Sequence, residues 1–509
     1  MKKRWIILII LVLLIGFGCY NFFVPHGGPR RAVANYKDLL RARGESLELQ
    51  TLHAVERPGR NAANEFLWFR AAWNSPRDNL YITAKHMLAP GFAVVGHTNI
   101  SAAQMSTYAT NKLRAAQLRE LLRGAKLDFN LDYLKGKMLL LPQLATLNAT
   151  TMCLGDTTMQ ALHENDLDEA TQDICAAVDL MRAWGDEPLL ISCLVRLACV
   201  RISIGFTWEA LQHDGWTDAQ LAAMQSDWEQ LDIISPLGTV LSGERAFGEN
   251  AMSKARTAKS YAGLQGGEAP GFGDWIGSLM TDGKKTLREA YDRFPKFWKW
   301  KSYWSFDEEH CFLELASAAV DASRKLATNR VFVPIYSSLM LQSSNIADAH
   351  RGGLQQYLLI TQDMMTDDGY TEHGIYLSTM KKAAQAEAAR GLLITAIALK
   401  RYHVRNGKWP DSLEQLVPDF LGKTPLDFMD GKPLRYKPVP GGQYRLYSVG
   451  LNGKDDGGNP SEPGLPWRPG LNINFTEGLD IVWPQRAAEQ EMQDFEARRG
   501  TNTNAVPSK

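Results

Sequence analysis

The most prominent feature of the hydropathy pattern is one long apolar run at the amino terminus. No charged residue occurs from Trp5 to Tyr20, three basic residues precede the run, and apolar residues extend it to Val24. About 20 apolar residues suffice for a helix to cross roughly 30 Å of hydrocarbon. The run therefore predicts a transmembrane anchor over 1–24. The alternatives are a cleaved signal peptide, although no small-x-small cleavage site follows, and a lipoprotein at Cys19, although the preceding residues match a lipobox poorly.

The orientation of this anchor is predicted from the lengths of its two flanks, because basic residues stand on both sides of it. Only a very short tail precedes the apolar run, whereas the bulk of the chain follows it. We therefore predict a single-pass protein of the inner (cytoplasmic) membrane whose bulk is extracytoplasmic. A second apolar stretch at 189–206 is interrupted by Arg196 and Arg201, which argues against a second span.

Between residues 62 and 378 the apolar residues recur at helical spacing. Spacings of three and four predict a helical hairpin over 151–184 that turns at 164–166, and Thr217 with Gln220 forms a capping box before a helix at 218–232. Further helices are expected at 101–123, 189–210, 307–329 and 343–364. The pattern predicts a mainly α fold with a helical bundle or solenoid-like body.

The segment before this body, 25–61, is short on apolar periodicity and rich in glycine and proline. We interpret it as a juxtamembrane stalk that contains one short helix at 35–44, closed by a glycine cap at Gly44.

The pattern changes again in the last quarter of the chain. A long amphipathic helix is predicted at 379–405, followed by a short helix that ends before Pro418. Alternating residues at 434–437 and 444–449 predict a β-hairpin. These elements indicate a small α+β module over 379–485, followed by a charged tail at 486–509 that is expected to be partly disordered.

Composition limits the possible functions. The 509 residues carry 56 basic and 56 acidic side chains, so the net charge is zero and no electrostatic footprint for nucleic acid is present. The 45% hydrophobic and 22% charged fractions are those of a globular protein whose length requires more than one structural unit. Nucleic acid is therefore not an expected partner.

Cysteines give no sign of a disulfide framework. Five lie outside the anchor, at positions 153, 175, 193, 199 and 311, and none forms a CxxC pair. Because the count is odd and the neighbours are apolar, we expect buried free thiols, with at most one bridge within 153–199.

No catalytic motif is recognisable: a zincin helix, a P-loop, a dinucleotide fingerprint and a nucleophile elbow are all missing from the sequence. His310 and Glu314 are four residues apart, so on a helix they face the same side and could hold a metal, with Glu308 or Glu309 nearby. Two ligands are too few for a site, and the preferred interpretation of the pair is an exposed polar face at a helix start.

The order of features from about 389 to 483 resembles the C-terminal domain of the G-type major pseudopilins of type II secretion systems. A helix is followed by Gly407-x-Trp409-Pro410, by Asp427-x2-Asp430-Gly431-Lys432-Pro433, by Tyr444-x2-Tyr447-Ser448 and by Asp455-Asp456-Gly457-Gly458. The anchor, however, lacks a prepilin cleavage site, and a large body separates it from the module. The arrangement of anchor, helical body and pseudopilin-like end resembles large uncharacterised bacterial membrane proteins.

The resemblance and the chemistry of the loop at 452–458 together suggest a calcium ion. Asn452, Asp455 and Asp456 supply hard oxygen ligands, the neighbouring glycines allow backbone carbonyls to join them, and Asp480 can complete the coordination from the final strand. The alternative is a solvated Asn/Asp/Gly turn without an ion.

Two functions are compatible with these patterns. The first is a structural or interaction protein of the cell envelope that binds other envelope proteins. The second is an envelope hydrolase whose site is assembled from dispersed residues of the helical body. Because no enzyme class is indicated, the first is preferred, and neither predicts a particular small-molecule ligand.

Overall fold

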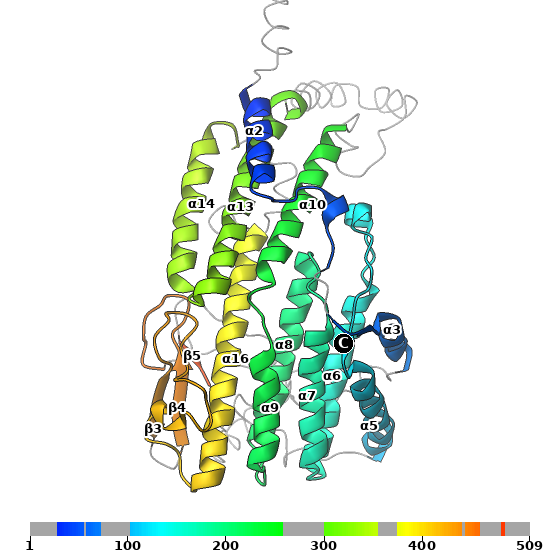
Figure 1. The fold of residues 1–509 in the computed structure, drawn as a ribbon, viewed down its shortest axis with the longest axis vertical. Helices are drawn as coiled ribbons and strands as arrows, with labels where there is room; N and C mark the ends of the chain where they lie inside the picture. Colours follow the sequence, from blue (N-terminus) through cyan, green and yellow to red (C-terminus); the bar gives the residue numbers. More distant parts are fainter. Residues whose placement is uncertain are drawn as a thin grey trace, which may run out of the picture.

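The described residues form an elongated bundle of α-helices with a small antiparallel sheet against one flank (Figure 1). The computed structural model describes residues 28–54, 58–72, 102–257, 300–354, 374–439, 443–458 and 480–483. Eleven α-helices lie in these ranges, which confirms the mainly α fold. The predicted anchor at 1–24 and the predicted tail at 486–509 lie outside the described residues.

One half of the bundle is built from helices that follow one another closely in sequence. The hairpin predicted at 151–184 is confirmed: its turn passes through Asn165 at φ 57°, and the side chain of Asp166 caps the second helix by accepting a hydrogen bond from the Glu169 backbone. The predicted capping box of Thr217 and Gln220 is also present. The helices of this half are α3 (Ala63–Ala72), α5 (Ala102–Leu122), α6 (Pro142–His163), α7 (Leu167–Ala183), α8 (Leu190–Leu211) and α9 (Asp218–Gln230).

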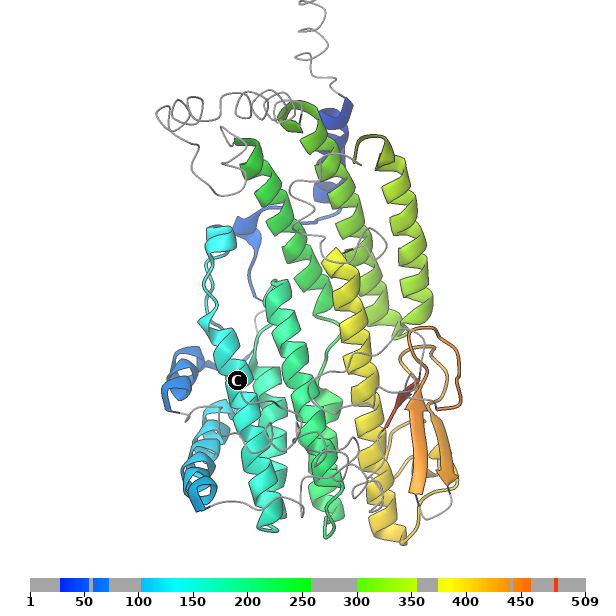
Figure 2. The ribbon, with the colours of Figure 1, turned by 180° about the vertical axis from the view of Figure 1, so that it is seen from behind.

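The other half carries the first described helix of the chain. There α2 (Gly28–Ala42) packs against α13 (Ser305–Asn329), which also contacts α10 (Leu237–Thr257) and α14 (Val333–Leu354), as can be followed in Figures 1 and 2. The long α16 (Gly374–Asn406) runs through the middle of the bundle and contacts α8, α9 and α13. Short 3₁₀ or π segments occur at Leu49–Thr51, Tyr133–Met138, Trp300–Trp304 and Leu413–Leu416.

Helix α8 explains the second apolar stretch of the sequence. It is long and apolar enough to span a membrane, and 61% of its most apolar window is buried inside the protein. It packs against α6, α7, α10 and α16, so it is apolar on every side because other helices surround it. Arg196 pairs with Asp186 at 2.9 Å, and burial lowers the pKa of Arg201 to about 10. These features are those of a core helix.

Within the predicted stalk, residues 28–54 pack on the body. Val33 and Leu40 of α2 are buried in a second apolar cluster together with Phe312 and Leu313 of α13. Helix α2 begins at residue 28 rather than at 35. A proline in the first turn, here Pro29, is tolerated because the N–H that it lacks would have no partner within the helix.

Ion pairs hold the same segment in place. Lys37 lies 2.7 Å from Glu249 and also pairs with the fully buried Glu309, which in turn lies 2.6 Å from Arg256. Glu45 pairs with Arg245 at 2.6 Å and with Arg324. The chain that follows the predicted anchor is thus held to α10 and α13 by buried charges as well as by apolar contacts.

The carboxyl-terminal sheet confirms the predicted hairpin. Strand β3 (Arg435–Val439) pairs antiparallel with β4 (Gln443–Ser448), and β4 pairs antiparallel with β5 (Ile481–Val482), so the strand order is β3-β4-β5. A separate parallel pair joins β1 (Arg60–Asn61) to β2 (Ala125–Lys126). Helix α16 covers the antiparallel sheet through β4.

Helix α16 packs against both the carboxyl-terminal sheet and the helical body. Consecutive residues from Ala383 to Arg390 are buried, which places partners on every side of the helix. Arg390 donates a hydrogen bond of 2.6 Å to the Trp228 carbonyl of α9, and the Phe332 backbone donates one of 2.9 Å to the Phe428 carbonyl. The boundary at 379 stays a prediction, and a fragment cut there would expose the side of α16 that faces α8 and α9.

Candidate functional site

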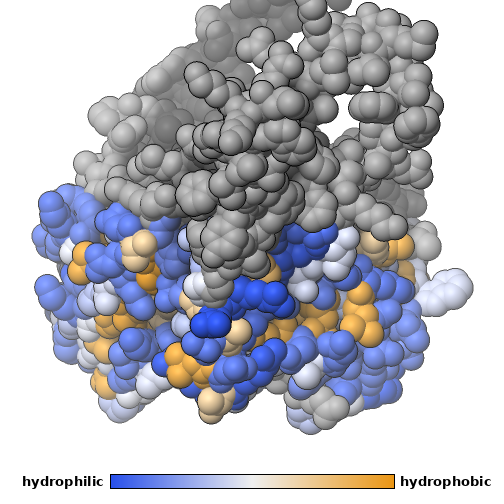
Figure 3. All heavy atoms as spheres, turned by 90° about the horizontal axis from the view of Figure 1, so that it is seen from above, coloured by the Kyte–Doolittle hydropathy of each residue, from blue (hydrophilic) through white to orange (hydrophobic). Residues whose placement is uncertain are grey.

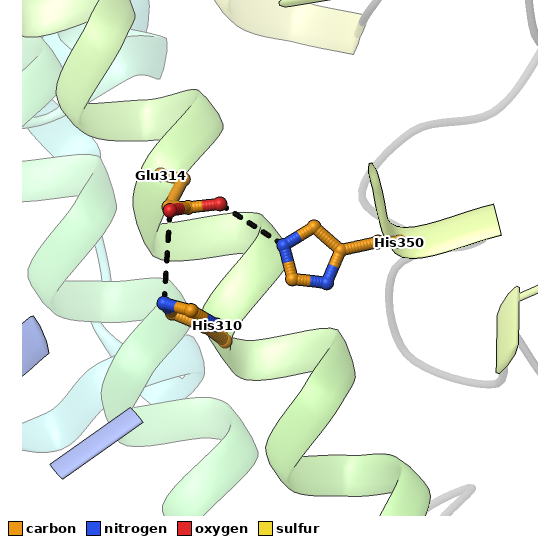
Figure 4. Close-up of side chains that lie close together, drawn as sticks. All are labelled: His310, Glu314 and His350. Carbon is orange, nitrogen blue, oxygen red and sulfur yellow. Dashed lines mark hydrogen bonds and ion pairs between the residues drawn. The ribbon is translucent and has the colours of Figure 1, made fainter. Parts of the chain in front are cut away.

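Two histidines and one glutamate meet between α13 and α14 (Figure 4). His310 and Glu314 lie one turn apart on α13, as predicted, and His350 reaches them from α14. The His350 Nε2 atom lies 3.0 Å from Glu314 Oε2, and the His310 Nε2 atom lies 3.7 Å from Glu314 Oε1. One possible ligand atom from each of the three residues lies within 4.8 Å of the other two. The structure thus adds a third ligand to the pair seen in the sequence.

Surrounding residues fix the orientation of both imidazoles. Asp307, one turn before His310 on the same helix, lies 3.1 Å from the other ring nitrogen of His350, Nδ1. The ring of His310 stands edge-on to that of His350, with centroids 5.2 Å apart, and edge-on to Tyr36 of α2 at 5.4 Å. The hydrogen bond with Asp307 and that with Glu314 raise the pKa of His350, against the effect of burial.

The cluster is shielded from solvent without being sealed. Side-chain exposure is 10% for His350, 19% for His310 and 28% for Glu314. Glu308 and Glu309, the other acidic residues considered from the sequence, are buried elsewhere, and Glu309 pairs with Lys37 and Arg256. Accessible ligand atoms and a rigid helical base are the features that a metal site requires.

The structure brings the residues of the predicted calcium loop only partly together. Asn452 Nδ2 donates to Asp456 Oδ2 at 3.1 Å, and the backbone N–H of Asp456 donates to Asp480 Oδ2 at 3.1 Å. The Asp455 carboxylate instead accepts from the Tyr447 hydroxyl at 3.0 Å and lies 3.6 Å from Arg435 Nε. The loop is therefore ordered by its own hydrogen bonds, and the Asp455 carboxylate, which also accepts from the Gly457 backbone at 3.0 Å, is held by Tyr447 and Arg435.

Among the four predicted calcium ligands, Asp480, which directly precedes β5, has the surroundings that best suit a cation. It is only 3% exposed, and its Oδ1 atom is buried without a hydrogen-bond partner. Burial raises the pKa of Asp480, and the negative charges of Asp455 and Asp456 raise it further. A buried carboxylate oxygen beside other negative charges would be stabilised by a bound cation.

Two of the cavities among the described residues are lined without a histidine. A small, partly open cavity is lined by Trp184, Glu187, Ser192 and Arg196, where Ser192 donates to the buried Glu187. A more open groove runs between α9 and the loop at 418–422. The five described cysteines are all free, which confirms the predicted free thiols, and burial raises the pKa of Cys153 to about 12.

Comparison of the chain with models of known protein families, with characterised proteins and with solved structures finds no match.

Proposed function

We propose that this chain is a single-pass protein of the inner membrane whose helical bundle stands outside the cytoplasm as a structural or interaction protein of the cell envelope. The observation that carries the proposal is the contrast between two apolar segments. The run at 5–24 contains no charged residue, whereas the one described helix that is both long and apolar enough to span a membrane, α8, lies in the bundle core.

One face of the bundle supports a water-exposed position. Seen from above, the described surface is mainly hydrophilic, with scattered hydrophobic residues (Figure 3). The tight attachment of α2 would place the bundle close to the membrane and limit its rotation about the anchor. A rigid body of this kind suits a scaffold that presents the same face to its partners.

Replacing residues 1–24 with a cleavable export signal tests the attachment. We expect the remaining chain to be recovered as a soluble, folded protein from the extracytoplasmic fraction, because the apolar surface of α8 is already buried against other helices in the core. The unmodified protein serves as the control and should stay in the membrane after a high-salt wash. A processed protein that still sediments with membranes, while helical by circular dichroism, would show a second membrane attachment.

We also propose that the module at 379–485 is pseudopilin-like and that its loop holds Ca²⁺ through Asn452, Asp455, Asp456 and Asp480. The order of sequence features and the unpartnered Asp480 oxygen support this. Ion binding would require Asp455 to exchange its contacts with Tyr447 and Arg435 for the cation.

Calcium is expected to stabilise the folded chain selectively. At about a hundred times its dissociation constant it should add roughly 2.7 kcal/mol to the free energy of unfolding of the module. Magnesium should add less, because it demands a stricter octahedron and releases water reluctantly. The measurement is thermal melting of the full chain in chelator and in millimolar Ca²⁺. The D455A/D456A variant is the control, and an equal response in that variant would remove the loop as the binding site.

A further inference from the structure

We propose that His310, Glu314 and His350 form a binding site for a divalent transition metal ion of the zinc class. This site is independent of the calcium loop and goes beyond the structural role proposed above. Its ligands come from two helices, and both imidazoles are directed toward Glu314, as Figure 4 shows.

Two of the three separations between the ligand atoms are close to those found around a metal. Metal–nitrogen and metal–oxygen bonds of about 2.0–2.2 Å place neighbouring ligands roughly 3.0 Å apart in an octahedron and about 3.4 Å apart in a tetrahedron. The observed distances from Glu314 to the two imidazoles are 3.0 and 3.7 Å. The third separation, between the imidazoles, is at most 4.8 Å, so the two rings would move closer together when an ion binds.

The contact between Asp307 and His350 is the arrangement that metal-binding histidines generally have. A carboxylate that accepts a hydrogen bond from one ring nitrogen leaves the other nitrogen unprotonated and directed at the ion. Here Asp307 lies 3.1 Å from Nδ1, and Nε2 faces Glu314. Asp307 is thus a positioning residue, and three residues remain as direct ligands.

The chemical types of the ligands determine the class of ion. Two imidazoles and one carboxylate suit Zn²⁺, Co²⁺, Ni²⁺ or Fe²⁺, whereas Ca²⁺ and Mg²⁺ prefer a full set of oxygens. Three protein ligands leave at least one coordination position for water or for an added ligand. The partial exposure of His310 and Glu314 leaves a path for the ion and for that ligand.

Without metal, the same residues can form a simple ion pair, in which a protonated His350 lies between Asp307 and Glu314. The two states differ in composition: the metal state contains one bound ion per chain and neutral imidazoles. The experiment must therefore measure the number of ions bound per chain and the ligand field around the ion. Activity or stability alone does not distinguish the two states.

The experiment is a Co²⁺ titration of the full chain in detergent, made without a polyhistidine tag and cleared of metal by a chelator. We expect visible d–d absorption that saturates at one ion per chain and is displaced by Zn²⁺. H350Q is expected to lower the affinity at least 100-fold, and E314Q gives a second test if H350Q fails to fold. D307N should lower the affinity about 10- to 100-fold, as loss of an orienting carboxylate does.

The matched control is H53Q, since His53 is an exposed histidine outside the cluster, and its titration should equal that of the unmodified chain. Absence of Co²⁺ absorption, or unchanged binding in the H310Q/H350Q double variant, would overturn the proposal. Binding that is lost only in D455A/D456A would assign the ion to the calcium loop and overturn it as well.

Discussion

Replacement of Asp427 with alanine is expected to lower the free energy of unfolding of the carboxyl-terminal sheet by about 3–5 kcal/mol. Asp427 is 1% exposed, and one carboxylate oxygen accepts from the Ser448 hydroxyl at 2.6 Å and from the Met429 backbone at 2.9 Å. The other accepts from the Val449 backbone at 2.8 Å and from Arg435 at 2.7 Å. Alanine would remove this acceptor from all four donors at once, although Arg435 keeps its pair with Asp430 at 2.6 Å.

The readout is hydrogen exchange of β3 and β4, because the expected change is local. Asp427 joins the loop before β3 to the end of β4, so its loss should remove amide protection from both strands while α6 and α7 keep theirs. D419A is the control: Asp419 lies in the same module with an exposed side chain, and surface substitutions usually change stability by less than about 0.5 kcal/mol. Equal protection in D427A and D419A would contradict the role assigned to Asp427.

Replacement of Arg245 with alanine is expected to weaken the attachment of the segment after α2 by about 3–5 kcal/mol. Arg245 is 1% exposed and donates to Glu45 at 2.6 Å and to the Ser317 hydroxyl at 3.1 Å. Its loss leaves Ser317 without this donor and Glu45 with Arg324 alone. Hydrogen bonds from Arg324 and Arg245 outweigh burial and lower the pKa of Glu45, which is therefore a carboxylate at neutral pH.

Urea denaturation of the full chain, followed by protease sensitivity of residues 28–54, measures this effect. In R245A the segment should become sensitive at a lower urea concentration than the core helices do. R41A is the matched control on α2, because the Arg41 side chain is 50% exposed and its ion pairs are on the surface. If R41A destabilised the segment as much as R245A, burial of the charge would not be the cause.

The sequence predicted those elements whose signals are local. The turn at Asn165 and Asp166, the capping box of Thr217 and Gln220, and the β-hairpin depend on residues within a few positions of one another. Helix starts were less accurate where a proline stands in the first turn. The helix predicted at 343–364 begins at Val333, and Pro334 is tolerated there because a first-turn N–H has no partner in the helix.

The candidate metal site required information that one sequence does not contain. The helical spacing of four placed His310 and Glu314 together, but the approach of His350 depends on the crossing and register of α13 and α14. Those follow from how whole side-chain ridges interdigitate. The attachment of α2 is similar, since the partners Lys37 and Glu309 are far apart in sequence. To predict either contact, one would need a set of related sequences in which the two positions change together.

The central claim, that the bundle stands outside the cytoplasm, is tested most directly by labelling a cysteine introduced at Asp214, whose side chain is 99% exposed. The native thiols that the structure describes give a low background, because burial raises the pKa of Cys153 and Cys193 to about 12 and the thiolate is the reactive form. A membrane-impermeant maleimide should label D214C in intact spheroplasts as fully as after lysis, and the unsubstituted protein should stay unlabelled. Labelling of D214C only after lysis would place the bundle in the cytoplasm and contradict the account.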